Sequence, residues 1–384
     1  MDNIFFLLNG VERLIYRKLL KPLLFALDAE QAHHLLMGVL SKSARIPGMQ
    51  SLFHGLYATK TNEALRLERF GLTFAHPLGL AAGLDKNAEA VPAFSAIGFA
   101  FMEVGTLTPR PQAGNERPRL FRLPVDQALI NRMGFNNVGA SQAAATLAQS
   151  LPRTKYRNPL AINIGKNKTT ANEQAVDDYR ACVRELFAYG DFFVVNISSP
   201  NTPDLRNLQY GEELNRLLQE IKQEMYEQAT AHRTDVKPIL VKIAPDMSEA
   251  ELKEVVATIV QSGVAGIIAT NTTVSRDGLH HPHQKEMGGL SGVPVRQRST
   301  EFIRLIYKWT NGELPIIGSG GIFDADDAYE KIRAGASLVE VYTGLVYRGP
   351  EMIGEIQRGL LKRMRQDGFT SIEQAIGADH RAEV

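Results

Sequence analysis

The 384-residue sequence predicts an α/β fold, a (β/α)8 barrel with an N-terminal helical extension, from three observations. From about residue 78 onward, eight short apolar runs alternate with longer amphipathic runs. Apolar strands that alternate with helices are typical of a parallel sheet covered on both faces, and eight such units suit a closed barrel. Residues 1–60 show helical patterns only. A doubly wound open sheet is the alternative, but no GxGxxG follows the first strand.

The N-terminal extension contains helical runs at 5–20 and 23–40, on either side of Pro22. In the first run apolar residues recur at helical spacing, and Arg13 and Arg17 fall on the opposite side. This helix either packs on the barrel or lies in a membrane interface with its apolar side toward lipid, and both can hold. We expect residues 1–60 to form a membrane-associated subdomain and residues 61–384 the catalytic barrel.

The barrel elements follow in order, with amphipathic runs between the apolar ones. The helix expected at 248–263 has a capping box, Ser248 with Glu251, and ends at Gly263. The other helices expected between strands are 172–189, 211–228 and 324–335. The strands are expected at 78–83, 101–106, 159–164, 192–197, 238–243, 266–270, 315–320 and 338–343.

The composition narrows the functional classes. Lys and Arg number 43 against 42 Asp and Glu, so there is no overall positive field for a nucleic-acid partner. The one cysteine, Cys182, excludes disulfide frameworks and cysteine-rich metal sites, and we expect no metal. No apolar run approaches the ~18 residues of a membrane-spanning helix.

Polar residues follow the strands where a barrel builds its active site, at the C-terminal strand ends. After the last two strands come 318-GSGG-321 and 342-YTG-344, where barrels of this type usually hold a phosphate. Tight strand-to-helix turns also need glycine, so this signal is ambiguous.

Lys242 lies inside the apolar strand 238–243, where a buried charge needs a partner. One interpretation is an internal ion pair with Glu103 or Glu340. The other is a fixed positive charge beside an electron-accepting cofactor.

Asparagines recur at the strand ends. Asn163 and Asn196 occupy matching positions on consecutive strands, and Asn131, Asn201 and Asn271 join them. Amides both donate and accept hydrogen bonds, so this set suits a flat ring that carries carbonyl and N–H groups.

Ten segments together, in order, are specific for one family. The chain resembles the class 2 dihydroorotate dehydrogenases, which are quinone-dependent and membrane-associated. The matching segments are LGLAAGLDKN (78–87), VGTLTPRPQAGNERPRLFR (104–122), INRMGFNN (130–137), AINIGKNK (161–168), NISSPNTP (196–203), VKIAPD (241–246), IIATNTT (267–273), GGLSG (288–292), IGSGGI (317–322) and YTG (342–344).

The resemblance implies an FMN-containing barrel that oxidises (S)-dihydroorotate to orotate in pyrimidine synthesis and passes the electrons to a membrane quinone. It implies Ser199 as the base that removes the C5 proton, with a relay through Thr202 and a water near Phe135. The implied substrate-binding residues are Lys86, Asn131, Arg132, Met133, Gly134, Phe135, Asn196, Asn201, Asn271 and Thr272. The implied FMN-binding residues are Ala82, Gly83, Lys86, Thr106, Asn163, Asn196, Lys242, Thr270, Gly292, Gly321, Tyr342 and Thr343.

Two features favour class 2 over the soluble class 1 relatives, which use cysteine as the base and lack the helical extension. Cys182 lies far back in a predicted helix, and an extension is present. The resemblance implies that the extension forms an apolar quinone tunnel, with Phe5, Phe6, Leu23, Leu24 and Phe25. It implies a monomeric, peripheral protein on the cytoplasmic face of a bacterial cell membrane. One departure is Asp204, where the family usually has glycine.

Three other functions remain open on the residues alone. A phosphate-binding lyase or isomerase without flavin would use Lys242 or Lys86 as a Schiff-base lysine. A membrane-surface scaffold would retain the barrel without its chemistry. Flavin-dependent tRNA reduction is disfavoured by the near-neutral charge and by the lack of a catalytic loop cysteine.

Overall fold

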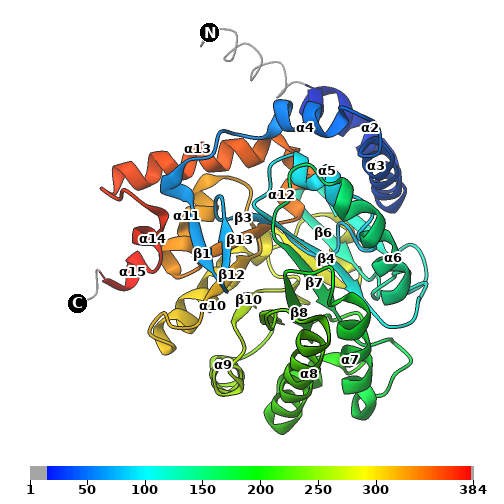
Figure 1. Ribbon diagram of the computed structural model, residues 1–384. Helices are drawn as coiled ribbons and strands as arrows, with labels where there is room; N and C mark the ends of the chain where they lie inside the picture. Colours follow the sequence, from blue (N-terminus) through cyan, green and yellow to red (C-terminus); the bar gives the residue numbers. More distant parts are fainter. Residues whose placement is uncertain (1–14, 382–384) are drawn as a thin grey trace.

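The computed structural model, which describes residues 15–381, is a closed parallel barrel surrounded by helices (Figure 1). Around the barrel the strands run β10-β12-β13-β3-β4-β7-β8-β9. All eight predicted strands are confirmed, mostly trimmed at their ends. They are β3 (Leu78–Leu80), β4 (Phe101–Leu107), β7 (Leu160–Ile164), β8 (Phe192–Asn196), β9 (Ile239–Ile243), β10 (Gly266–Ala269), β12 (Ile316–Ser319) and β13 (Leu338–Val341).

The four predicted barrel helices are confirmed as α7, α8, α9 and α11. The capping box of Ser248 and Glu251 forms at the start of α9, and Gly263 ends it in the left-handed conformation at φ 67°. The helices outside the strands are α5 (Val91–Ala96), α6 (Ala140–Ser150), α7 (Ala175–Leu186), α8 (Gly211–His232), α9 (Glu249–Ser262), α10 (Arg296–Trp309), α11 (Ala325–Ala334), α12 (Thr343–Arg348) and α13 (Glu351–Gln366), followed by α14 (Ile372–Ala375) and α15 (Ala378–Arg381).

A short hairpin, β1 (Leu67–Arg69) and β2 (Leu72–Phe74), packs its aromatic rings against the barrel interior. The ring centroid of Phe74 lies 5.5 Å from that of Phe101 on β4, and Phe70 lies 6.0 Å from Phe192 on β8. Phe101 and Phe192 begin their strands, so the aromatic stack fills the N-terminal end of the barrel. Three-residue strands are too short to show alternation, which is why the sequence did not predict this hairpin.

A second sheet that the sequence did not predict borders the other end of the barrel. Its antiparallel strands, β5 (Leu120–Leu123), β6 (Ala128–Asn131) and β11 (Gly289–Gly292), come from insertions after β4 and β10. In the register, Asn131 at the end of β6 lies opposite Gly289. The sheet therefore fixes Asn131 at the mouth of the barrel.

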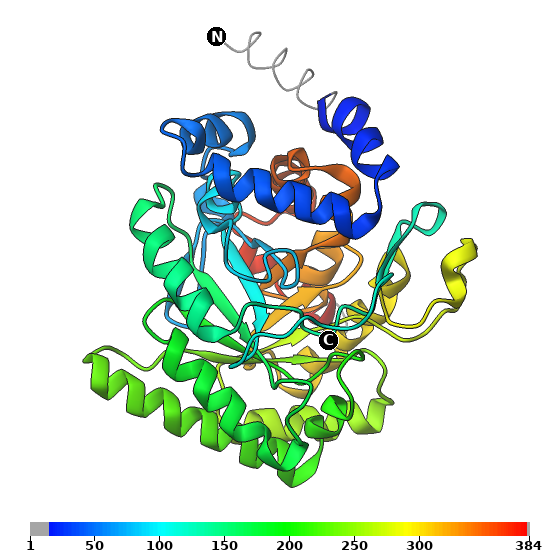
Figure 2. The ribbon, with the colours of Figure 1, turned by 90° about the vertical axis from the view of Figure 1, so that its right-hand side faces the viewer.

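The described N-terminal helices form a layer at one end of the barrel, and α3 crosses that end (Figures 1 and 2). The layer comprises a π-helical turn, Ile15–Leu20, then α2 (Lys21–Ala26), α3 (Ala29–Ser43) and α4 (Met49–Tyr57). Pro22 does not separate two helices as predicted: it sits in the first turn of α2, where its missing N–H costs nothing. The break comes at Leu27, and Asp28 then caps α3. The part of the expected first helix before residue 15, with Phe5, Phe6 and Arg13, lies outside the described residues.

Polar contacts attach this layer to the barrel domain. Arg119 donates to Glu30 on α3 at 2.7 Å, and both side chains are buried. The Tyr16 hydroxyl donates to the Val346 carbonyl at 2.7 Å, and Arg122 donates to the Leu24 carbonyl at 2.9 Å. Within residues 15–381, no helix is both long and apolar enough to span a bilayer.

Candidate active site

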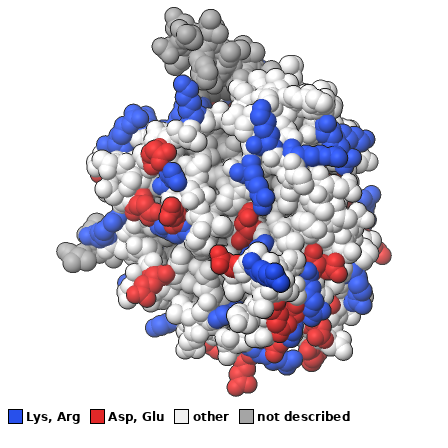
Figure 3. Space-filling model, in the orientation of Figure 1, with Lys and Arg blue, Asp and Glu red and all other residues white. Residues whose placement is uncertain are grey.

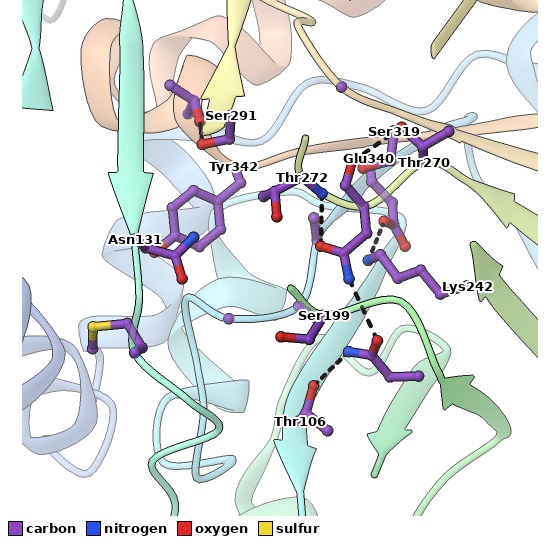
Figure 4. Close-up of a pocket in the computed structure, with 18 of the residues that line it drawn as sticks. Thr106, Asn131, Ser199, Lys242, Thr270, Thr272, Ser291, Ser319, Glu340 and Tyr342 are labelled. Carbon is purple, nitrogen blue, oxygen red and sulfur yellow. Dashed lines mark hydrogen bonds and ion pairs between the residues drawn. The ribbon is translucent and has the colours of Figure 1, made fainter. Parts of the chain in front are cut away.

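A cavity opens at the C-terminal ends of the barrel strands and holds about 1160 Å³ of free space, including its open mouth. Figure 4 shows Asn131 and Tyr342 on one side of it and Lys242 and Glu340 on the other, with Ser199 facing the space between. Most residues predicted for substrate or FMN line this cavity. They are Ala82, Gly83, Lys86, Thr106, Asn131, Met133, Gly134, Phe135, Asn196, Ser199, Asn201, Lys242, Thr270, Asn271, Thr272, Gly292, Gly321, Tyr342 and Thr343.

Two of the predicted site residues do not line the cavity. Asn163 is fully buried beneath it, where its amide bonds the residues of the floor. The guanidinium of Arg132 pairs with Glu286 at 2.6 Å and lies over the ring of Phe121. Arg132 follows Asn131 in the sequence, but the sequence could not show that its side chain turns away from the cavity.

Lys242 forms the internal ion pair that the first interpretation expected, and it also lines the cavity. Its Nζ lies 2.6 Å from Glu103 and 3.3 Å from Glu340. Burial alone would lower the pKa of Lys242, but the two acidic side chains outweigh it and raise the pKa. A lysine held protonated in this way is a poor Schiff-base nucleophile, which argues against Lys242 as the lysine of a lyase.

The two carboxyl groups differ in their hydrogen bonds. Glu103 accepts from Lys242, from the Ala82 N–H at 3.0 Å and from the Asn163 amide at 2.5 Å. One oxygen of Glu340 is buried without a hydrogen-bond partner among the described residues. Burial opposes ionisation of Glu103, but Lys242 and the donated hydrogen bonds lower its pKa. Burial and the charge of Glu103 raise the pKa of Glu340 well above its usual range, so Glu340 gives up its proton less readily than Glu103.

The asparagine side chains form two hydrogen-bonded groups, one at the floor of the cavity and one on a wall. Asn196 donates to the Thr106 hydroxyl at 2.8 Å and to the Asn163 carbonyl oxygen at 3.2 Å. Asn271 in turn donates to the Asn196 carbonyl oxygen at 3.4 Å. On the opposite wall, Asn201 donates to the Asn131 carbonyl at 3.1 Å. These bonds hold the amides in fixed orientations around the cavity.

Ser199 lies in the loop after β8, where its Oγ accepts a hydrogen bond from the Asn201 N–H at 3.2 Å. The nearby Thr202 hydroxyl is buried without a hydrogen-bond partner in the described structure. Asp204, in the same loop, is exposed and has φ 55°, the left-handed region. Glycine adopts this conformation without strain and aspartate tolerates it, which accounts for the departure noted in the sequence.

Glycines bring the backbone close to the end of the cavity formed by β11, β12 and β13. A Cβ at Gly321 would lie 2.5 Å from Cβ of Arg296, and one at Gly344 would lie 2.2 Å from the Ile322 carbonyl oxygen. The hydroxyls of Ser291 and Thr343 lie 2.8 Å apart at the same end. This close backbone, with the N-terminus of α12, suits a phosphate group.

Lys86 connects the cavity with the N-terminal layer. It donates to the Gly83 carbonyl, and burial lowers the pKa of Lys86 to about 8, although Glu30 on α3 acts in the opposite direction. On the same helix, burial and the charge of Lys86 hold the pKa of His33 well below its usual range. The charge of Lys86 in the cavity therefore acts on His33 in the layer and favours its neutral form.

Some residues that line the cavity were missed as site residues. Ser291 comes with the unpredicted strand β11, and Glu340 was considered only as a partner of Lys242. The position of Glu340 within an apolar strand was the signal that could have identified it as a site residue. In the described part of the chain, no group of three or more His, Cys, Asp or Glu side chains could hold a metal.

Comparisons with known proteins agree with this architecture. The family model for dihydroorotate dehydrogenase matches residues 64–364. A dihydroorotate dehydrogenase (quinone) of Deinococcus deserti is 51% identical over 365 residues, covering 95% of this chain and all of that protein. The Myxococcus xanthus enzyme of the same name is 51% identical over 363 residues, covering 94% and 98%.

Solved structures show the same likeness in three dimensions. The dihydroorotate dehydrogenase of Eimeria tenella, in complex with ferulenol, superposes with a TM-score of 0.84 at 39% identity and covers 92% of this chain and 96% of that chain. Its ligand-free form also gives 0.84, at 40% identity, covering 92% and 99%. By sequence, fold and the arrangement of the barrel mouth, this chain belongs to the dihydroorotate dehydrogenase family.

Proposed function

We propose that this protein oxidises (S)-dihydroorotate to orotate in pyrimidine synthesis, with FMN in the barrel mouth and a membrane quinone as the electron acceptor. The observation that carries the proposal is the cavity itself. It joins an asparagine network and Ser199 to a buried cationic lysine and a glycine-lined end. The asparagines can hydrogen-bond to a flat polar ring, Ser199 can remove a proton, and the lysine can stabilise a group that gains negative charge.

The residues present fit FMN. The glycine-lined end, with Gly292, Gly321 and Thr343, would hold the phosphate, and Thr106, Lys242 and Thr270 would hold the ring. The partnerless buried oxygen of Glu340 leaves a hydrogen bond for a ligand in the cavity. Bound FMN supplies the acceptor for the hydride that leaves C6 of the substrate. The protonated Lys242 stabilises the charge that accompanies this transfer.

Ser199 is the proposed base at C5, and the asparagines hold the substrate against it. Asn131 and Asn201 are hydrogen-bonded to each other on one wall, and Asn196 and Asn271 on the other, so substrate binds without reorienting them. A serine hydroxyl needs help to release its own proton. The buried Thr202 hydroxyl, which lacks a partner in the described structure, supports a relay through that side chain.

The quinone is proposed to approach through the N-terminal layer. Leu24 and Phe25 of α2 are half-buried, and the Phe25 ring packs on Tyr347 at 5.4 Å. The neutral His33 beside Lys86 offers a polar group between the layer and the cavity. These contacts support a route from the surface of the layer to the flavin.

We propose that the protein attaches as a monomer to the cytoplasmic face of a bacterial membrane, and the surface of the layer supports the attachment itself. Nine exposed large apolar residues occur within 15–57, among them Leu35 and Val39 of α3 and Leu52 of α4. In Figure 3 the upper right of this face, where α3 and α4 lie in Figure 1, is white and blue without red. Apolar residues with basic neighbours are suited to an anionic lipid surface.

The test is an anaerobic rapid-mixing experiment on purified holoenzyme, with oxidised-flavin absorbance as the readout. Dihydroorotate should bleach the flavin, and ubiquinone or menaquinone should restore it faster than fumarate or NAD. Recovery from fumarate or NAD would keep the oxidation but overturn the quinone assignment. A purified protein without flavin would overturn the cofactor and the reaction.

A further inference from the structure

A second cavity lies between the N-terminal layer and the barrel domain, outside the catalytic cavity. It holds about 850 Å³ of free space, including its opening. Four cations line it: Arg17 and Lys21 from the layer, and Arg296 and Arg348 from the barrel domain. Asp324 is the one carboxylate in its wall.

The wall of this basic cavity carries more cations than carboxylates. Arg17 and Arg348 share Glu355, at 3.2 and 2.6 Å, and Arg296 pairs with Asp327 at 2.8 Å. Those two carboxylates lie outside the wall, in which Asp324 alone faces the four cations.

Two cations of the basic cavity each have a nitrogen without a hydrogen-bond partner among the described residues. The Arg348 Nε is buried without a hydrogen-bond partner in the described structure. The Lys21 ammonium lies over the rings of Phe25 and Tyr347, at 5.2 and 5.3 Å, and forms no ion pair with a carboxylate among residues 15–381. Burial and the charge of Arg17 lower the pKa of Lys21. An anion in the cavity would relieve this crowding of like charges.

The segment formed by the π-helical turn and α2 turns leucines outward beside the basic cavity. Arg17 and Lys21 line the cavity on the protein side, and Lys18 is exposed. Leu19, Leu20 and Leu23 are 61%, 46% and 68% exposed. The polar ties of Tyr16 and Arg122 hold the segment in this orientation. A lipid surface accommodates both sides, with acyl chains on the leucines and headgroups at the cations.

We propose that the basic cavity binds the phosphate of an anionic phospholipid headgroup while the neighbouring leucines enter the acyl region. This rests on the proposed membrane attachment and gives it a specific headgroup site. A free phosphate compound would share the charge chemistry but leaves the adjacent exposed leucines unexplained.

The experiment compares holoenzyme variants in flotation with vesicles of phosphatidylcholine alone or mixed with phosphatidylglycerol. Lys21→Gln and Arg17→Gln remove a cavity cation, and Lys18→Gln removes an exposed cation of the same helix as the matched control. We expect each cavity variant to weaken partitioning onto the anionic vesicles about tenfold and the control about twofold. Flavin reduction by dihydroorotate, measured on the same samples, should be unchanged in all three.

The outcomes separate the possible sources. Equal losses in Lys18→Gln and Lys21→Gln would reduce the effect to the general surface field and overturn the site. Thermal protection by inorganic phosphate, equal to that by soluble short-chain phosphatidylglycerol and lost in Lys21→Gln, would assign a free anion instead. A parent protein that binds no vesicle would overturn the lipid site, while intact flavin reduction would leave the catalytic proposal standing.

Discussion

The barrel mouth and the N-terminal layer solve opposite physical problems. In the mouth, polar side chains are buried and tied to one another, as in the chain from Glu103 through Asn163 to Asn196. In the layer, leucines face outward and a few polar contacts, led by Glu30 with Arg119, hold the helices to the barrel domain. The hydrogen bonds of the mouth hold its side chains in fixed positions, which suits catalysis. The layer exposes apolar side chains to solvent, which suits binding to a membrane.

The sharpest test of the mouth is Ser199→Ala. Without the base, dihydroorotate-dependent flavin reduction should slow by about 10²–10⁴-fold, and flavin content should be unchanged. Ser199→Cys should restore part of the rate, with a pH dependence that follows a thiol. Rapid mixing across pH measures both. A Ser199→Ala enzyme at parental rate would show that the hydroxyl only shapes the loop.

Variants of Glu103 and Glu340 test whether one or two negative charges balance Lys242. Near pH 4.5 and below, where Glu340 is largely protonated in both the folded and the unfolded protein, Glu340→Gln should stay within about 1 kcal/mol of the parent stability. The double variant with Glu103→Gln leaves Lys242 unpaired and should cost about 3–5 kcal/mol. That cost should exceed the sum of the single variants, because Glu340 can ionise when Glu103 is neutralised. Denaturant unfolding of all four proteins measures this.

The pH dependence of Glu340→Gln has a definite sign. The folded pKa of Glu340 is raised from its ordinary 4.5, so its contribution is favourable below that pH and is lost as pH rises. The variant should therefore gain stability relative to the parent between about pH 4.5 and 7. A constant difference across this range would contradict the assigned proton.

The attachment of the layer should respond to acid. Burial opposes ionisation of Glu30, but Arg119, His34 and Arg117 lower its pKa to about 2. A depressed folded pKa gives stability that is present above the ordinary value of 4.5 and is lost as pH falls toward 2. Hydrogen-exchange protection of α3 should fall over this window before that of the barrel strands.

A double-mutant cycle with Glu30→Gln and Arg119→Gln should give a coupling of about 0.5–3 kcal/mol. The exposed pair of Glu63 and Arg66, 3.5 Å apart, is the matched control, with a coupling of about 0–1 kcal/mol. Equal couplings for the two pairs would mean that the buried contact does not hold α3 to the barrel domain.

The sequence predicted the features that repeat locally. Eight apolar runs marked the barrel strands, and the capping box at Ser248 marked the start of α9. Asn163 and Asn196 were predictable neighbours because parallel strands end at one edge, whereas Asn131 comes from the antiparallel sheet that the sequence did not predict. In the sheet of β5, β6 and β11, the strand β11 pairs with β6 from more than 150 residues away, and no local period records such pairing. β5 and β6 are neighbours in sequence, but with four residues each they are too short to show a clear alternation.

Side-chain direction and protonation were also beyond the local pattern. Arg132 neighbours Asn131 in sequence but turns to Glu286, a partner brought by a distant insertion. Lys242 was recognised as buried, but the unequal protonation of its two acidic partners depends on which of them also meets Ala82 and Asn163.

The aromatic stack at the closed end of the barrel carries one more consequence, for the order in which heat removes activities. Phe74 and Phe101 interlock beneath the floor that holds Lys242, whereas no comparable ring stack joins α3 to the barrel domain in the described structure. Tightly packed segments open with the highest free energy, and sparsely anchored ones open first. On warming, the protein should lose its ability to hand electrons onward while it still takes them from its substrate.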